Sequence, residues 1–184
     1  MVQEQTQKII IGVDPGFSVT GYAVVAYGQG KTWVLDCGCL KMSSKDNLSV
    51  RTGIFYKFFA EKITMFHAHG VALETSFLGK NAQVFLKLGY LRGILYLLAD
   101  QHKLSISEFA PREVKSAVTG FGGASKDQVA GVLVRIFPKL TTFTQDQRTD
   151  ATDALGIALC GLWHDQRQTL LTSNLNQNRH ILSR

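Results

Sequence analysis

The chain has 184 residues, 45% of them hydrophobic, and its 20 Lys and Arg residues outnumber its 14 Asp and Glu residues. This length and composition predict one globular domain with a single core and exclude collagen-like and low-complexity chains. The longest nearly apolar runs, residues 88–99 (interrupted by Arg92) and 154–163, are shorter than the roughly 18 residues of a membrane span, so we expect no membrane association. The sequence has three cysteines without a C-x-x-C pair, which predicts neither a disulfide framework nor a zinc site. Its first residues show no secretory signal, and together these observations predict a reduced, cytoplasmic protein.

Strands are predicted where short apolar, β-branched runs end in turn signals. Five such runs occur, at residues 8–14, 21–27, 32–42, 71–74 and 104–109. The first three are joined by short connections, which favours an antiparallel meander. The later two are separated from their predecessors by helical patterns, which favours crossover connections.

Helices are predicted where apolar residues recur at helical spacing or where capping signals occur. The predicted helices cover residues 47–69, 81–101, a segment from Pro111, a segment from the Ser125–Gln128 capping box to about Phe137, and 150–164. This order predicts an α/β fold, a mixed five-stranded sheet with helices on both faces. We expect residues 1–165 to form the domain and the polar residues 166–184 to form a flexible tail.

Four acidic residues fall where this fold would bring them together. Asp14 ends the first strand and Glu74 ends the fourth, and the two ends are neighbours if a right-handed crossover lays the fourth strand beside the first. Asp150 and Asp153 are three residues apart on the last helix and therefore share one of its faces. Converging carboxylates need a cation, and their hard oxygen atoms suit Mg²⁺ or Mn²⁺. Two such ions would clamp the attacking and leaving oxygen atoms of a phosphodiester.

Structural roles explain some of these acids equally well. Asp14 precedes Pro15 and Gly16 and suits a turn, and Asp150 and Asp153 suit the cap and first turn of a helix. Glu74 is harder to explain in this way, because a Glu that follows Val-Ala-Leu is a poor strand residue unless it is paired.

Basic residues are concentrated between residues 75 and 135. This segment contains eight Lys or Arg residues and four Asp or Glu residues, so its net charge is +4. Lys80, Arg112, Lys115 and Lys126 flank loops or helix starts, where they could contact phosphates or simply remain solvated. Phe77 lies in a predicted loop and could stack on an unpaired base or fold back onto the core.

Four blocks in order resemble the RuvC-type Holliday-junction resolvases, the crossover junction endodeoxyribonucleases. They are IIIGVDPGFSVTGYAVV, ALETSFLGKNAQVFLKLGYLRG, FAPREVKSAVTGFGGASKDQV and TDATDALGIAL, and they fall between residues 9 and 159. The resemblance implies an RNase H-like fold, a homodimer paired through the helix from Asn81 to Gln101, and metal-dependent, symmetric nicking of four-way DNA junctions. It also implies a junction-binding protein and a branch-migration ATPase as partners.

The resemblance also assigns roles to individual residues. The family's four acidic ligands fall on Asp14, Glu74, Asp150 and Asp153, and its base-stacking aromatic falls on Phe77. Its two functional lysines fall on Lys115 and Lys126, of which the second would stabilise charge at the scissile phosphate. Gly123 stands where relatives often carry Arg, which removes one candidate phosphate contact.

Three other functions compete with this interpretation. The Asp-Pro-Gly turn with Thr20 and Gly21 also resembles the first phosphate loop of actin-like and sugar-kinase ATPases, which use two such domains. A non-catalytic DNA-binding module on the same scaffold would not need the four acids. A general RNase H-like nuclease would act on RNA–DNA hybrids.

Overall fold

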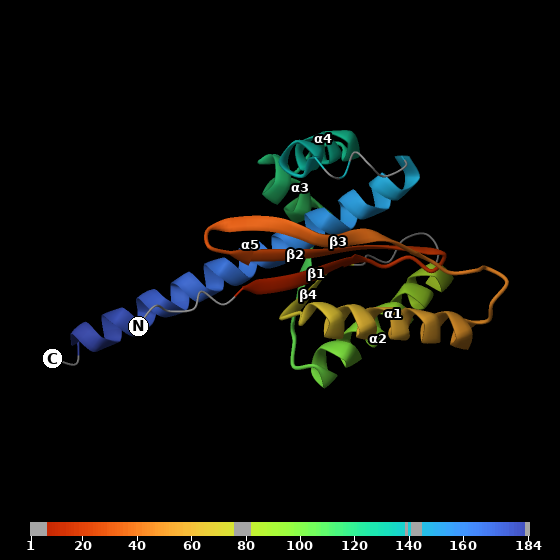
Figure 1. The fold of residues 1–184 in the computed structure, drawn as a ribbon, viewed down its shortest axis with the longest axis horizontal. Coiled ribbons are helices and arrows are strands. Elements are labelled where there is room, and N and C mark those ends of the chain that lie inside the picture. The colour runs from red at the N-terminus through yellow and green to blue at the C-terminus, as the bar shows by residue number, and fades with distance from the viewer. Residues whose placement is uncertain (1–6, 76–81, 139, 141–144, 183–184) are drawn as a thin grey trace.

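The computed structural model describes residues 7–75, 82–138, 140 and 145–182, and its centre is a five-stranded sheet (Figure 1). The strands are β1 (Lys8–Asp14), β2 (Val19–Gly28), β3 (Lys31–Lys41), β4 (Gly70–Glu74) and β5 (Ser105–Phe109). Their spatial order is β3-β2-β1-β4-β5, with β1–β2 and β2–β3 antiparallel and β1–β4 and β4–β5 parallel. The predicted meander, crossovers and mixed sheet are therefore confirmed.

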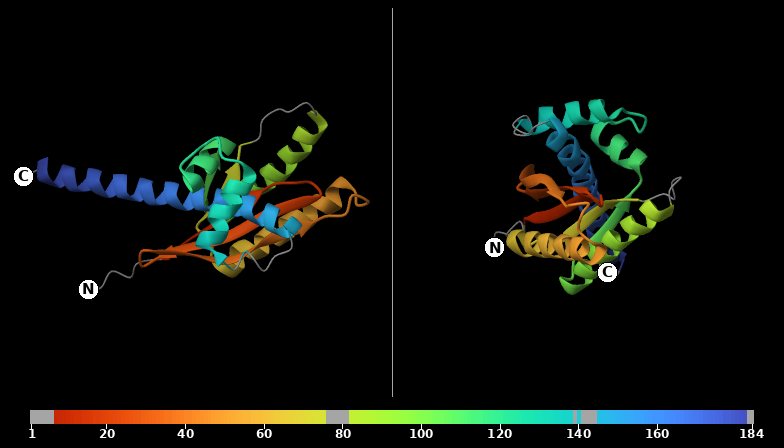
Figure 2. Two further views of the ribbon diagram at one scale, coloured as in Figure 1. Left: turned by 90° about the horizontal axis from the view of Figure 1, so that it is seen from above. Right: turned by 90° about the vertical axis from the view of Figure 1, so that its right-hand side faces the viewer.

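Five helices cover the two faces of this sheet. They are α1 (Leu48–Phe66), α2 (Ala82–Gln101), α3 (Pro111–Thr119), α4 (Lys126–Ile136) and α5 (Gln145–Leu182). Figures 1 and 2 show α1 and α2 on one face and α3, α4 and α5 on the other. The predicted starts of α3 at Pro111 and of α4 after Ser125 are confirmed, because Ser125 and Gln128 form the capping box.

The sheet separates two apolar cores, and β1 contributes to both. Successive residues of a strand point to opposite faces, so a strand covered on both sides reads as a continuous apolar run. Ile11 and Val13 pack with Phe55 of α1 in one core, whereas Ile10 packs with Leu155 of α5 in the other. All five side chains are at most 2% exposed. Burial on both faces explains why the sequence IIIGV within β1 contains no polar residue.

Helix α5 differs from its prediction at both ends. It begins at Gln145, so Asp150 lies beyond the first turn and the interpretation of Asp150 as an N-cap is wrong. It also continues to Leu182 and extends past the edge of the sheet, whereas the sequence predicted a helix that ends at residue 164 (Figure 1). The flexibility of residues 166–184 stays a prediction. Residues 166–184 contain no Gly or Pro, and their polar side chains do not stop a helix that the core has already nucleated. The domain boundary at residue 165 stays a prediction.

Helix α2 is partly core and partly exposed. Of the stripe Val84, Leu88, Leu91, Leu95 and Leu98, the last three are fully buried, whereas Val84 is 50% exposed. Among the residues that the structure describes, α2 is the one helix that is long and apolar enough to cross a membrane. Of its most apolar 18-residue stretch, 22% is buried inside the protein. A helix that packs on the core of a globular domain can be equally long and apolar, and α2 packs on this core through Leu91, Leu95 and Leu98. Its length and composition are therefore weak evidence for a membrane span.

Candidate active site

Parallel pairing of β1 and β4 places Asp14 and Glu74 at the same edge of the sheet. Val13 is the partner of Leu73 in the register, so the two acids follow at equivalent positions. The chain leaves the sheet after Asp14 in a loop that Thr20 holds closed, since its hydroxyl donates to the Gly16 carbonyl at 2.8 Å. Two strand-end carboxylates therefore face one another across adjacent strands, as predicted.

Helix α5 brings the third acid to this edge because it packs unusually close to the sheet. A Cβ atom on Gly12 would collide with the Ala154 carbonyl, and one on Gly21 would collide with the Asp150 carbonyl. Only glycine allows the helix backbone to lie that near to β1 and β2. Ala154 and Ala158, whose atoms lie against Gly12 of β1, are fully buried.

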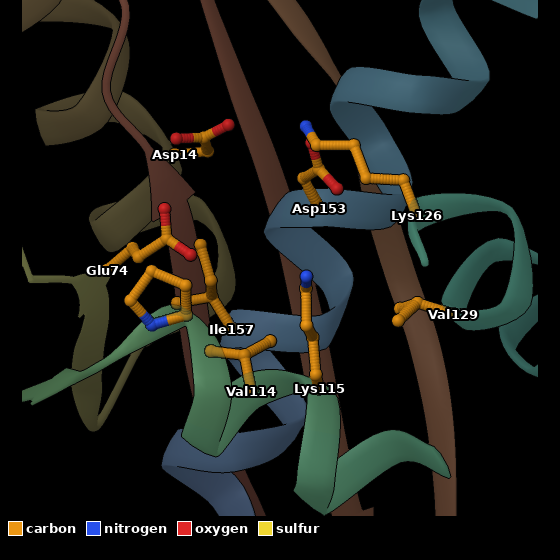
Figure 3. Close-up of a pocket in the computed structure, with 9 residues that line it drawn as sticks. Asp14, Glu74, Val114, Lys115, Lys126, Val129, Asp153 and Ile157 are labelled. Atoms are coloured by element: carbon orange, nitrogen blue, oxygen red, sulfur yellow. The ribbon is translucent and has the colours of Figure 1, made fainter. Parts of the chain in front are cut away.

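Asp14, Glu74 and Asp153 line one cavity of about 200 Å³ together with Lys115 and Lys126. Figure 3 shows the three carboxylates and the two ammonium groups directed into a common space, above an apolar floor. The floor and walls comprise Pro111, Val114, Val129 and Ile157. The structure thus brings together three of the four predicted acids and two of the predicted lysines. Asp150 does not line this cavity.

Burial and repulsion from neighbouring carboxylates raise the pKa values of Asp14 and Glu74 above their usual range. Burial, with repulsion from Asp153 and Asp150 added and attraction to Lys126 opposing it, raises the pKa of Asp14 from 3.8 to about 6. Burial likewise raises the pKa of Glu74, with repulsion from Asp14 and Asp153 added. Asp150 therefore acts on Asp14 electrostatically even though it lies outside the cavity lining.

Lys126 neutralises part of this negative charge. It is the first residue of α4, and its Nζ lies 2.6 Å from Oδ2 of Asp153. The hydrogen bond to Asp153 raises the pKa of Lys126, so the ammonium form persists at neutral pH. Lys115, on α3, lines the opposite side of the same cavity, where its charge lowers the pKa of Glu74.

The carboxylates suit a hard divalent cation in chemistry, although they do not yet enclose one. Three carboxylates from three separate elements, two of them with raised pKa values, form a donor set that a cation would stabilise in its charged form. Within the described residues, no three His, Cys, Asp or Glu side chains converge closely enough to hold an ion, and Lys126 is paired with Asp153. The donor chemistry therefore fits Mg²⁺ or Mn²⁺, provided that the side chains turn inward.

Of the predicted basic site residues that the structure describes, Arg112 is not brought to the cavity. Arg112 is exposed at the start of α3 and does not line it; its side chain instead lies where a Cβ atom on Gly122 would be. Phe77 and Lys80 lie outside the described residues. At Gly123, a Cβ atom would lie 2.6 Å from the Phe121 ring, so a larger residue there would require that ring to move.

Two arginines that the sequence did not mark as site residues donate hydrogen bonds to backbone carbonyls at or after the ends of β1 and β4. Arg51 of α1 donates a hydrogen bond to the Phe17 carbonyl in the loop that follows Asp14. Arg92 of α2 donates to the Glu74 carbonyl at 2.6 Å. The signal for Arg92 was present in the sequence, because it is the charged residue that interrupts the apolar run 88–99.

Comparison with known proteins identifies the family. The family model for crossover junction endodeoxyribonuclease RuvC matches residues 10–161, most of the chain. The chain belongs to the RuvC family. A RuvC from Chlorobium phaeobacteroides is 46% identical over 154 residues, which cover 84% of this chain and 81% of that relative. A RuvC from Legionella pneumophila is 36% identical and covers 83% and 85%, respectively.

Solved structures of the family agree with the fold described above. The structure of Thermus thermophilus RuvC in complex with Holliday junction substrate superimposes with a TM-score of 0.77 at 27% identity. The match covers 88% of this chain and 97% of that one. The predicted RNase H-like fold is therefore confirmed, with its five-stranded mixed sheet and helices on both faces.

Proposed function

We propose that this chain resolves four-way DNA junctions, hydrolysing phosphodiester bonds in paired, symmetric nicks during recombination and repair. The observation that carries the proposal is the cavity in which Asp14, Glu74 and Asp153 meet Lys115 and Lys126, in a chain of the RuvC family. A non-catalytic DNA-binding module would have no use for three carboxylates whose burial costs free energy.

The acids would hold Mg²⁺, for which Mn²⁺ could substitute, as two ions per active site. Asp14, Glu74 and Asp153 would be ligands from within the cavity, and Asp150 would join them from the same face of α5. Bound ions would activate the attacking water and neutralise the leaving 3′ oxygen. Until then the raised pKa of Asp14 lets its carboxyl group retain a proton more readily than an exposed aspartate does.

Lys126 would bind the scissile phosphate. Its ammonium group lies at the rim of the cavity on a side chain that is 70% exposed, so it can exchange Asp153 for a phosphate oxygen. The apolar side chains of Val114 and Ile157 limit water on the other side, which strengthens the attraction between Lys126 and a developing negative charge.

The junction itself would be bound by the basic residues around the cavity. Lys115 would contact phosphate from within it, and Arg112 and Lys80 from its surroundings, whereas Phe77 would stack on an unpaired base at the branch point. Phe77→Ala should therefore leave metal binding intact and impair cutting, as measured by single-turnover cleavage.

A second copy of this chain would bind the exposed face of α1 and α2. Large apolar side chains of α2 remain exposed there, and an apolar groove lined by Leu48, Tyr90 and Leu97 runs between the two helices. A two-fold dimer presents two identical cavities, and a four-way junction offers two strands related by a two-fold axis. We also propose that the protein works in the cytoplasm with a junction-binding protein and a branch-migration ATPase.

Cleavage of matched substrates tests the function. A labelled four-way junction, its linear duplex and an RNA–DNA hybrid are each incubated with and without Mg²⁺. We expect paired incision of the four-way junction and of neither other substrate, and only when Mg²⁺ is present. Asp14→Asn and Glu74→Gln should abolish this incision. Asp100→Asn, which removes a carboxylate that is 81% exposed, serves as the control. Normal cutting by either cavity variant would overturn the assignment, and preferred cutting of the hybrid would indicate a general RNase H-like nuclease.

The oligomeric state tests the dimer. Leu97→Glu places a charge on the exposed face of α2, and Ile136→Glu places the same charge on an equally exposed site of α4, across the sheet. Light scattering after gel filtration should show a monomer for the first variant and a dimer for the second and for the unmodified protein. A monomeric unmodified protein would contradict the proposal.

A further inference from the structure

Arg92 makes a pair of contacts beside the candidate site that the proposed chemistry does not use. Its side chain reaches from α2 to the end of β4 and is only 14% exposed. Nη1 donates a hydrogen bond to the carbonyl oxygen of Glu74 at 2.6 Å, while Nη2 lies 2.5 Å from Oε1 of Glu108 on β5. One guanidinium group therefore joins a helix to the last residues of two neighbouring strands.

Glu108 is itself held in place. It pairs with Leu73 in the register of β4 and β5, directly before Glu74. The hydroxyl of Tyr96, one turn after Arg92 on α2, donates to the Glu108 carboxylate. Arg92, Glu108 and Tyr96 thus form a network in which each charged group has a partner, as a poorly hydrated ion pair requires.

These contacts fix the peptide group that follows Glu74. The next residue, Thr75, donates its backbone N–H to the Phe109 carbonyl at 2.8 Å, and Arg92 donates to the Glu74 carbonyl of the same peptide group. A peptide held at both its carbonyl and its N–H is hindered from rotating, which restricts the ψ angle of Glu74 and with it the direction in which the Cβ atom leaves the backbone.

We propose that Arg92 is a positioning residue for Glu74: it locks the end of β4 so that the Glu74 carboxylate faces the cavity. The inference rests on the proposed function in taking Glu74 as a metal ligand. Arg92 would act through the backbone, because the charges that shift the pKa of the Glu74 carboxyl are those of Asp14, Asp153, Lys126 and Lys115. Outer residues that orient a metal ligand in this way are commonly as necessary as the ligand.

The geometry requires arginine in particular. A guanidinium group offers donors in two fixed directions within one plane, so it reaches a carbonyl and a carboxylate at once. A lysine ammonium at the same position could satisfy one of the two partners. The helix that supplies Arg92 also carries the exposed apolar face proposed to bind a second copy, so a displacement of α2 would be transmitted to Glu74.

Binding of Mn²⁺ to the DNA-free, full-length protein is the primary test, measured by calorimetry. Arg92→Met keeps the aliphatic stem and removes both polar contacts; Arg92→Lys keeps the charge; Lys57→Met removes an exposed cation from α1 as the matched control. We expect Arg92→Met to weaken Mn²⁺ affinity about 10–100-fold, a typical loss for an outer-shell partner. Arg92→Lys should recover part of the loss, and Lys57→Met should bind normally.

Two further readouts separate positioning from a general structural role. Junction binding without metal should be unchanged in Arg92→Met, and the Mg²⁺ concentration for half-maximal cleavage should rise in parallel with the Mn²⁺ dissociation constant. If Arg92→Met unfolds, Glu108→Gln carries the same test, because it removes the charge that anchors the guanidinium group and keeps an acceptor.

Unchanged Mn²⁺ affinity in both Arg92→Met and Glu108→Gln would overturn the proposal, and so would an equal loss of metal-free junction binding. Failure of the proposed function would look different: Glu74→Gln would then bind Mn²⁺ as tightly as the unmodified protein. In that case Glu74 is no ligand, whatever Arg92 does.

Discussion

Replacing Asp14 with Asn should stabilise the metal-free protein while abolishing cleavage. Folding moves the Asp14 carboxyl into the cavity, where burial raises its pKa from 3.8 to about 6. That difference corresponds to about 3 kcal/mol of unfolding free energy lost at neutral pH, taking 1.36 kcal/mol per pH unit. Because Asp14 retains some contact with solvent, we expect the neutral isostere to recover about 1–3 kcal/mol.

The sign follows from proton binding. Between pH 3.8 and about 6 the folded protein retains a proton that the unfolded chain releases. The free energy of unfolding therefore falls as pH rises through this window, and the whole penalty is present above it. Below pH 3.8 both states are protonated, and Asp14→Asn should no longer differ from the unmodified protein.

Urea unfolding followed by circular dichroism in EDTA, at neutral pH and below pH 3.8, measures the difference. Added Mg²⁺ should then reverse the order, because it stabilises the folded protein only where the ligand set is intact. Asp100→Asn, at an exposed position, should change nothing. Asp14→Asn being less stable than the unmodified protein in EDTA at neutral pH, or a gain that persists in acid, would refute the reasoning.

Three further perturbations test the scaffold and the cavity. Lys126→Met should slow single-turnover cleavage about 100-fold and weaken junction binding far less, since its charge matters most at the transition state; equal losses would make it a simple anchor. Arg51→Met should lower the free energy of unfolding by about 1–3 kcal/mol, because it removes the hydrogen bond that the buried Arg51 donates to the partly buried Phe17 carbonyl; an unchanged urea midpoint would contradict this. Gly12→Ala should destabilise the protein by about 1–3 kcal/mol through its collision with α5, whereas Gly53→Ala, which meets nothing within 4 Å, should stabilise α1 by about 0.5–1 kcal/mol. Equal effects at the two glycines in urea titrations would argue against the close approach of α5.

The sheet could be predicted because its signals are local and strong. The run from Lys8 to Asp14 has an apolar, mostly β-branched centre between two charged ends, and its predicted limits match β1 residue for residue. Short connections favour the antiparallel pairs, and the handedness of crossovers leaves few arrangements, one of which lays β4 beside β1 as observed. From that arrangement the meeting of Asp14 and Glu74 follows without further information.

Features that depend on packing between distant segments were less accessible. The Leu-rich spacing on α2 does not say which side of the helix meets the sheet, and Leu91, Leu95 and Leu98 are buried in the core while other apolar residues remain exposed. The end of α5 has no stop signal in the sequence, so composition alone suggested fraying where the helix continues. The contact between Arg92 and Glu74 depends on how α2 crosses β4, which no local pattern specifies.

Lys126 connects the metal-free cavity to the proposed reaction. In the structure its ammonium group is paired with Asp153, and its charge lowers the pKa of Asp14 and of Glu74. A metal ion bound to Asp153 would compete with Lys126 for that carboxylate, so we expect the ammonium group to turn toward the phosphate when metal and DNA are bound. Removing Lys126 should therefore have two effects. It should raise the pKa of Asp14 and of Glu74 in the absence of metal, and it should remove a positive charge from the scissile phosphate. The first effect should disappear at saturating Mg²⁺ and the second should remain, so Lys126→Met should stay slow at every metal concentration.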